Sequence, residues 1–223
     1  SGVIAFLSVA IVLGMEESLP NAAKLRVTHF KLKIEDLWDS RAKEPAILMM
    51  LTVTMFGAII TLIPDYSKGL GILNKGLFIS IMTVATILTR LFTSKMSDVR
   101  GRIFSCKIGT AFWILGAVLL VFRQIELFYL SAVVCGFASG INSPALFAWA
   151  VDVANGHRAG RAMATLFIAL EAGITIGAFA SAFIYNNHFE NFTFVFSAIA
   201  ILNMGALTFL FFGVKNPKEP LLN

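Results

Sequence analysis

The charged residues of this chain are clustered, and long apolar stretches with little or no charge separate the clusters. A helix that crosses a bilayer needs about 20 mostly apolar residues, and charged side chains near its ends can reach the headgroups. Six stretches meet this requirement: 46–64, 71–92, 104–122, 127–150, 161–185 and 192–213. They predict an all-α, polytopic membrane protein with a six-helix bundle over residues 46–214.

The composition excludes the common soluble classes. Hydrophobic residues make up 57% of the 223 residues and charged residues only 14%, whereas a typical soluble domain has about 25% charged residues. Intrinsic disorder needs the opposite composition, and two Cys are too few for a disulfide-stapled domain. We therefore expect the lipid bilayer as the main partner, and no nucleic acid despite the net charge of +5.

Residues 1–15 are uncharged but too short for a comfortable span. They have neither the basic leading region nor the Ala-x-Ala cleavage site of a signal peptide. We expect them to be the end of a truncated transmembrane helix, which makes the chain a fragment of a longer protein.

The longest polar stretch, 16–45, is predicted to be a cytoplasmic linker. Apolar residues recur at helical spacing in its second half: Phe30, Ile34, Leu37 and Trp38. Two interpretations fit this pattern. The segment is either an amphipathic helix on the membrane surface or a plain linker between two bundles.

The distribution of Lys and Arg predicts the orientation. When the loops are placed alternately on two sides, fifteen of the 18 basic residues fall on the same side. The positive-inside rule assigns that side to the cytoplasm. It includes the tail at 215–223, so the C-terminus is predicted to be cytoplasmic.

Glu171 is the one charged residue between positions 162 and 187, in the span at 161–185. An ionised carboxylate near the bilayer centre is costly unless it is protonated, paired or hydrated. Thr175 and several alanines share its helical face, which suits a helix that lines a cavity. We expect a proton-coupling or substrate-binding residue; the alternative is a protonated structural Glu that is hydrogen-bonded to a neighbouring helix.

Isolated polar residues in two other spans are candidates for the wall of the same cavity. Asn142 and Ser143 precede Pro144 in the fourth span, and Asn203 lies in the middle of the sixth. Two small-residue motifs, Gly136-x-x-x-Gly140 and Gly173-x-x-x-Gly177, are typical of close helix packing.

The connection between the second and third spans combines charge with a turn residue. Arg90 lies near the end of the second span, and Asp98, Gly101 and Arg102 follow it. Gly101 allows a tight reversal, and the arginines can pair with nearby carboxylates. The loop is either a latch between two bundles or a solvated basic loop that obeys the positive-inside rule.

The Ser, His and Cys residues do not have the spacing that catalytic and metal-binding motifs require. Ser139 does not stand in a Gly-x-Ser-x-Gly sequence, and the three His are scattered. Cys106 and Cys135 form no Cys-x-x-Cys pair, and there is no phosphate-binding glycine loop. We expect no enzymatic activity, no cofactor and no metal site.

The stretch from Pro64 to Arg102 resembles a half of a major facilitator superfamily transporter. Members carry a Gly-x-x-x-Asp-Arg-x-Gly-Arg-Arg loop, which Asp98, Gly101 and Arg102 match. Three positions depart from the motif: Ser94, Val99 and Ile103. With these departures the loop resembles the second, more degenerate copy of the motif, which lies between helices 8 and 9.

A second block, from Gly140 to Gly173, is similar to the run from helix 10 through helix 11 of this family. The resemblance covers almost the whole chain and implies the end of helix 6, the central loop and helices 7–12. The partner that it implies is a missing N-terminal six-helix bundle, with the small-molecule substrate bound between the two.

The resemblance implies a secondary active transporter of a small solute, here a C-terminal half, in a bacterial plasma membrane. With Glu171 as the coupling acid, we expect proton-coupled efflux or uptake. The residues assigned to the cytoplasmic gate are Arg90, Asp98, Gly101, Arg102, Asp152 and Arg161. The alternative is a stand-alone structural or assembly subunit without a transport cycle.

Two pairings within that gate are expected. Asp98 should face a helix of the missing bundle, by the pseudosymmetry of the family. Asp152 should pair with Arg102 or Arg90 within this chain, because the spans that carry them end on the same side of the membrane.

Overall fold

The computed structural model describes residues 37–93, 96–154 and 159–214, which all belong to one compact unit, Ile34–Asn223. The predictions for 1–15 and 215–223, and those for most of the linker at 16–45, lie outside the described residues.

Every predicted span coincides with a helix, and the described residues contain no strand. The elements are η2 (Ser40–Ala42), α3 (Lys43–Gly69), α4 (Leu77–Thr93), α5 (Met96–Arg100), α6 (Arg102–Val121), α7 (Ile125–Val153), α8 (Ala159–Tyr185), η3 (Phe189–Asn191), α9 (Phe192–Thr208) and a closing π-helical turn, η4 (Phe209–Gly213). The predicted all-α fold is confirmed.

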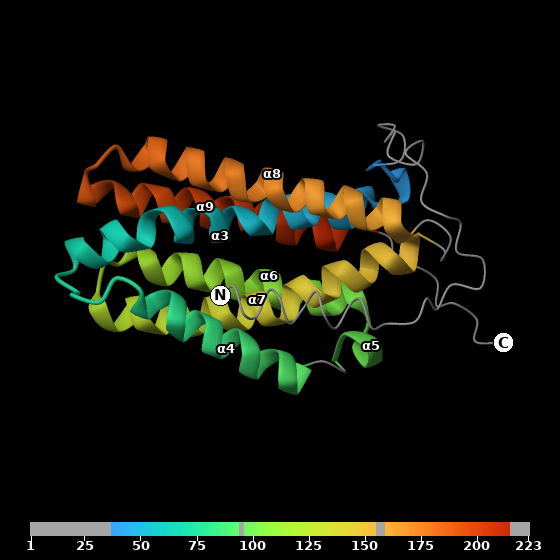
Figure 1. Cartoon of the computed structure of the whole chain (residues 1–223), viewed down its shortest axis with the longest axis horizontal. Helices are drawn as coiled ribbons and strands as arrows, with labels where there is room; N and C mark the ends of the chain where they lie inside the picture. Colours follow the sequence, from blue (N-terminus) through green and yellow to red (C-terminus); the bar gives the residue numbers. More distant parts are fainter. Residues whose placement is uncertain (1–36, 94–95, 155–158, 215–223) are drawn as a thin grey trace, which may run out of the picture. The chain divides into compact units, whose positions relative to one another are not determined.

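The long helices run up and down because their connections are short. α3 packs mainly against α8, α4 packs against α7, and α6 packs against both α7 and α9 (Figure 1). One end of the unit carries α5, the start of α6 and the last turn of α7, and we call it the Arg102 end. The other end carries the last turn of α3, and we call it the Tyr66 end.

Two helix boundaries differ from the expected ones by five or six residues. α4 begins at Leu77 instead of residue 71, because Gly71 adopts a φ of 75° and the Asn74 side chain accepts a hydrogen bond from the Gly76 backbone amide. α3 continues past Pro64 to Gly69, since Tyr66 is fully buried in the core and holds the last turn.

Five of the described helical segments are long and apolar enough to cross a membrane. The sixth, α4, has 17 residues, which at 1.5 Å per residue extend about 25 Å, against a hydrocarbon core of about 30 Å. Flanking side chains that reach the headgroups, or local thinning of the bilayer, can accommodate this difference.

The two predicted glycine motifs are at close helix contacts, as expected. A Cβ added at Gly177 would lie 2.2 Å from the Thr54 carbonyl oxygen on α3, and one at Gly173 would lie 2.5 Å from the Met50 carbonyl oxygen. On α7, a Cβ at Gly136 would lie 2.4 Å from the Cβ of Ala85 on α4. The helices approach so closely only because these positions lack side chains.

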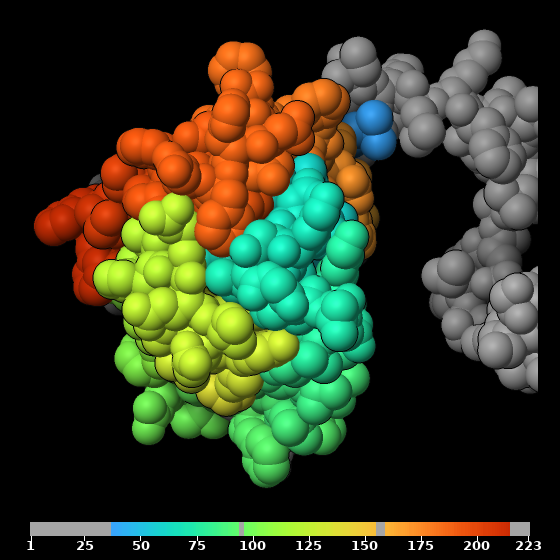
Figure 2. Space-filling model, turned by 90° about the vertical axis from the view of Figure 1, so that its left-hand side faces the viewer, coloured from blue at the N-terminus to red at the C-terminus, as the bar shows by residue number. Residues whose placement is uncertain are grey.

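An aromatic cluster around Tyr66 closes the opposite end of the unit. The Tyr66 ring stacks on Phe128 with ring centres 5.6 Å apart and meets the edge of Phe192 at 4.5 Å. Its hydroxyl donates a hydrogen bond of 2.5 Å to the Leu120 carbonyl near the end of α6. Figure 2 looks onto this end, where the connections after α3 (teal), α6 (yellow-green) and α8 (orange) lie side by side.

Candidate functional site

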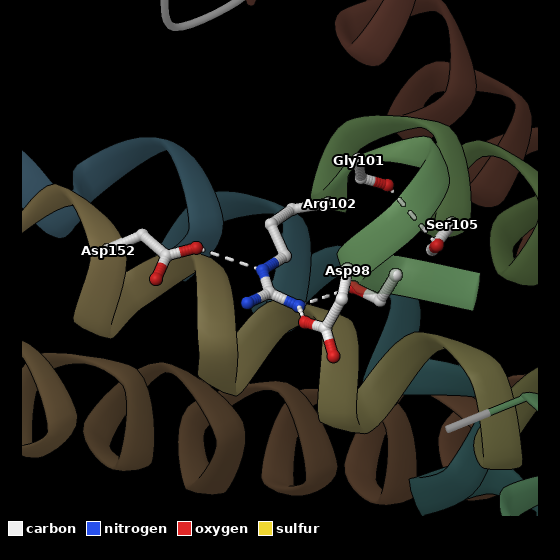
Figure 3. Close-up of polar contacts among 6 residues, drawn as sticks. Asp98, Gly101, Arg102, Ser105 and Asp152 are labelled. Carbon is white, nitrogen blue, oxygen red and sulfur yellow. Dashed lines mark hydrogen bonds and ion pairs between the residues drawn. The ribbon is translucent and has the colours of Figure 1, made fainter. Parts of the chain in front are cut away.

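Arg102 ties three elements together at its end of the unit. It is the first residue of α6, and its Nε donates a hydrogen bond of 2.8 Å to Oδ2 of Asp152 in the last turn of α7 (Figure 3). Its Nη1 forms an ion pair with Asp98 on α5 and donates a hydrogen bond of 3.1 Å to the Ser97 hydroxyl. The expected pairing of Asp152 with Arg102 is therefore present.

The electrostatics of this cluster are those of a partly exposed network. The Arg102 side chain is 26% exposed, whereas Asp98 and Asp152 are 63% and 53% exposed. Solvent screens such pairs strongly, so that their contribution to stability is small. The two carboxylates link α5 and α7 through one guanidinium.

The backbone at Gly101 makes this arrangement possible. Gly101 has a φ of 92° and reverses the chain between α5 and α6, and its carbonyl accepts a hydrogen bond of 3.3 Å from the Ser105 hydroxyl (Figure 3). The tight reversal that the sequence predicted at Gly101 is confirmed. The five-residue helix α5 in front of it, which presents Ser97 and Asp98, was not predicted.

The expectation that Asp98 faces a helix of a missing bundle stays a prediction, because the described residues include no such helix. The Asp98 carboxylate turns back to Arg102, four residues later in the chain. The reversal at Gly101 places Asp98 beside the first turn of α6, where the nearest guanidinium belongs to the same loop.

A cavity of about 340 Å³ adjoins the cluster. Its lining comes from the end of α4, from α5, from the start of α6 and from the middle of α7: Arg90, Thr93, Met96, Ser97, Asp98, Arg102, Ser105, Gly140, Ile141, Pro144 and Ala148. Arg90, Asp98 and Arg102 thus share one cavity. Arg161 lies half-buried in the first turn of α8 and does not line it.

Glu171 and Thr175 lie on the exposed side of α8. The opposite side of the same helix, with Gly173 and Gly177, packs against α3. Among the described residues none forms an ion pair or hydrogen bond with Glu171, so the alternative of a hydrogen-bonded structural Glu finds no partner within this part of the chain.

The four residues predicted for a cavity wall lie in different environments. Asn142 is buried, and its Nδ2 donates a hydrogen bond of 3.1 Å to the Thr52 hydroxyl on α3, whereas its Oδ1 has no partner. Asn203 is also buried and donates to the Ile199 carbonyl of its own helix at 3.0 Å. Ser143 is half-buried and Thr175 is exposed.

Thr52 was missed by the sequence analysis. It accepts the hydrogen bond from Asn142 and donates one of 2.9 Å to the Leu48 carbonyl of its own helix. A threonine in an apolar span gives no signal in the sequence that distinguishes this role from ordinary packing.

The described residues contain no group of three or more His, Cys, Asp or Glu side chains that could hold a metal ion. Cys106 and Cys135 are separate, buried thiols.

The comparison with protein families agrees with the fold. The sequence profile described as Major Facilitator Superfamily matches residues 45–223, which is most of the chain. No curated protein matches the chain. An all-α bundle with five long apolar helices, together with this match, identifies an integral, multi-pass membrane protein. The chain belongs to the major facilitator superfamily, whose members are membrane transporters of small solutes and not enzymes.

Proposed function

We propose that this chain is the C-terminal half of a proton-coupled secondary transporter, with Glu171 as the coupling carboxylate. The observation that carries the proposal is the position of Glu171 in the middle of a membrane-length helix, on the side that this unit leaves exposed. Lipid is a poor environment for a carboxylate. A second bundle or a water-filled path must therefore cover this face of α8.

The N-terminal six-helix bundle of the family is the proposed cover. Substrate would bind between the two bundles, which rock against each other to expose it alternately. The residues that we assign to this half of the cavity are Ser143 and Thr175, together with the buried amides Asn142 and Asn203.

The Arg102 cluster is the proposed gate on the cytoplasmic side. Arg102 holds α5 against α7 through Asp98 and Asp152, and Gly101 provides the reversal that this geometry needs. Arg90 and Arg161 contribute further positive charge at the same end. The excess of basic residues supports a cytoplasmic location for this end and for the C-terminus. The membrane that we propose is a bacterial plasma membrane.

Reconstitution of the full-length carrier into liposomes tests the coupling role. Candidate solutes are offered with and without an imposed pH gradient, and accumulation is measured. Glu171→Gln should abolish uphill accumulation, because the amide cannot carry a proton, whereas Glu126→Gln changes an exposed carboxylate at the Tyr66 end and should have little effect.

Two outcomes would contradict the proposal. Wild-type accumulation by Glu171→Gln with unchanged pH dependence would exclude Glu171 from coupling. The absence of any solute flux in the wild-type protein, across a broad set of solutes, would favour a structural or assembly subunit.

A further inference from the structure

A groove opens between α4 and α6 at the Arg102 end. Both helices pack against α7, one on each side, and they make little contact with each other. The cavity of about 340 Å³ lies in this groove, with Gly140, Pro144 and Ala148 of α7 among its lining. Ligand pockets span about 300–1,000 Å³, so this one suits a small group and not a large solute.

The charge of the groove is positive because of Arg90. Two arginines and one aspartate line it. Arg102 is engaged by Asp98 and by Asp152, whereas no carboxylate among the described residues forms an ion pair with Arg90. Arg90 therefore supplies a guanidinium that is available to an anion, and Thr93 and Ser97 line the same cavity.

Apolar residues that are adjacent in the sequence to two lining residues of the cavity are exposed. Leu91 and Phe92 follow Arg90 and are 69% and 84% exposed, and Val99 follows Asp98 and is 81% exposed. A free anion in water gains no binding energy from exposed apolar side chains. A phospholipid combines both features, since its phosphate is anionic and its chains are apolar.

We propose that this groove binds the phosphate group of an anionic phospholipid, with the Arg90 guanidinium as its cationic ligand and with Leu91, Phe92 and Val99 in contact with the acyl chains. Guanidinium groups bind phosphate oxygens through paired, charge-assisted hydrogen bonds. Basic pockets between transmembrane helices on the cytoplasmic side are suited to anionic headgroups.

The proposal agrees with the orientation under "Proposed function", but binding itself does not depend on it. The full-length protein in dodecyl maltoside is titrated with dioleoylphosphatidylglycerol, with dioleoylphosphatidylcholine and, separately, with inorganic phosphate. The apparent melting temperature reports binding, and its dependence on ligand concentration gives Kd.

Phosphatidylglycerol should bind more tightly than zwitterionic phosphatidylcholine, and inorganic phosphate should have little effect. Arg90→Gln should weaken phosphatidylglycerol about fivefold, since one basic side chain at an anionic lipid surface contributes roughly 1 kcal/mol. The matched control is Arg41→Gln, which removes an exposed arginine at the same end but outside the groove. It should leave Kd unchanged.

A second variant tests the shape of the groove without a change of charge. Ala148→Leu fills part of the floor and should weaken phosphatidylglycerol at least as much as Arg90→Gln does. Equal losses in Arg90→Gln and Arg41→Gln would show general attraction to charge and overturn the site. An equal affinity for inorganic phosphate, with the same dependence on Arg90, would overturn the lipid as its ligand. If Glu171→Gln transports like the wild type, the coupling proposal is wrong, but the proposed lipid site is not affected.

Discussion

Arg102 and Asp152 stand 50 positions apart in the sequence, yet their side chains meet at 2.8 Å and join the first residue of α6 to the last turn of α7. Because Asp98 holds the same guanidinium, the loop after α4 is tied to α7 through a single side chain. A change at Arg102 therefore affects two contacts together.

A double-mutant cycle measures the strength of this link. Arg102→Gln and Asp152→Asn are made separately and together, and thermal unfolding in detergent is compared. The coupling energy should be below about 1 kcal/mol, because the carboxylate is half exposed and solvent screens the pair. A coupling of several kcal/mol would mean that the pair is shielded from water in the complete protein.

Gly101→Ala tests the reversal between α5 and α6. A φ of 92° with a ψ of 153° is accessible to glycine but strained for alanine, so the substitution should cost about 1–3 kcal/mol in apparent unfolding free energy. It should also misplace Asp98 relative to Arg102 and weaken the gate. The control is Gly160→Ala, since Gly160 has open space around it and no positive φ; equal effects of the two variants would contradict the interpretation.

Gly177→Ala tests the contact between α3 and α8. The added Cβ would meet the Thr54 carbonyl oxygen at 2.2 Å, so the helices must separate, and overpacking of this kind costs about 1–3 kcal/mol. Gly205→Ala, in α9, meets no atom within 4 Å and should leave the melting temperature unchanged or raise it. If Gly177→Ala is as stable as the wild type, the two helices are not in the close contact described.

Tyr66→Phe tests the hydrogen bond at the other end of the bundle. The ring stays in the aromatic cluster, but the Leu120 carbonyl loses its donor, which should cost about 0.5–1.5 kcal/mol. Tyr129→Phe, on a half-buried tyrosine of α7, should have no comparable effect on thermal unfolding. A neutral result for Tyr66→Phe would show that ring packing alone holds this end closed.

The boundaries of the helices show how far sequence reasoning reaches. The apolar stretch at 192–213 matches α9 and its closing π-helical turn, since apolar length is a property of consecutive residues. The start of α4 was missed by six residues, because the turn at Gly71 and Asn74 is built by local hydrogen bonds that an apolar count does not register.

In the candidate site, too, some features were predictable from the sequence and others were not. The glycine motifs, the reversal at Gly101 and the pairing of Asp152 follow from residue type and from the alternation of spans. Three features could not be inferred in this way: the hydrogen bond between Asn142 on α7 and Thr52 on α3, the ion pair of Asp98 with Arg102, and helix α5.

By itself, the sequence determined that this chain is a helical, multi-pass membrane protein, and it predicted where most of the described long helices begin and end. Only the tertiary structure decided which polar side chains meet, that Glu171 lies on the open side of α8, and that α4 and α6 leave a basic groove between them. The physical reason is that apolar length acts along the chain, whereas a partner is chosen by the rotation and separation of helices that are distant in sequence.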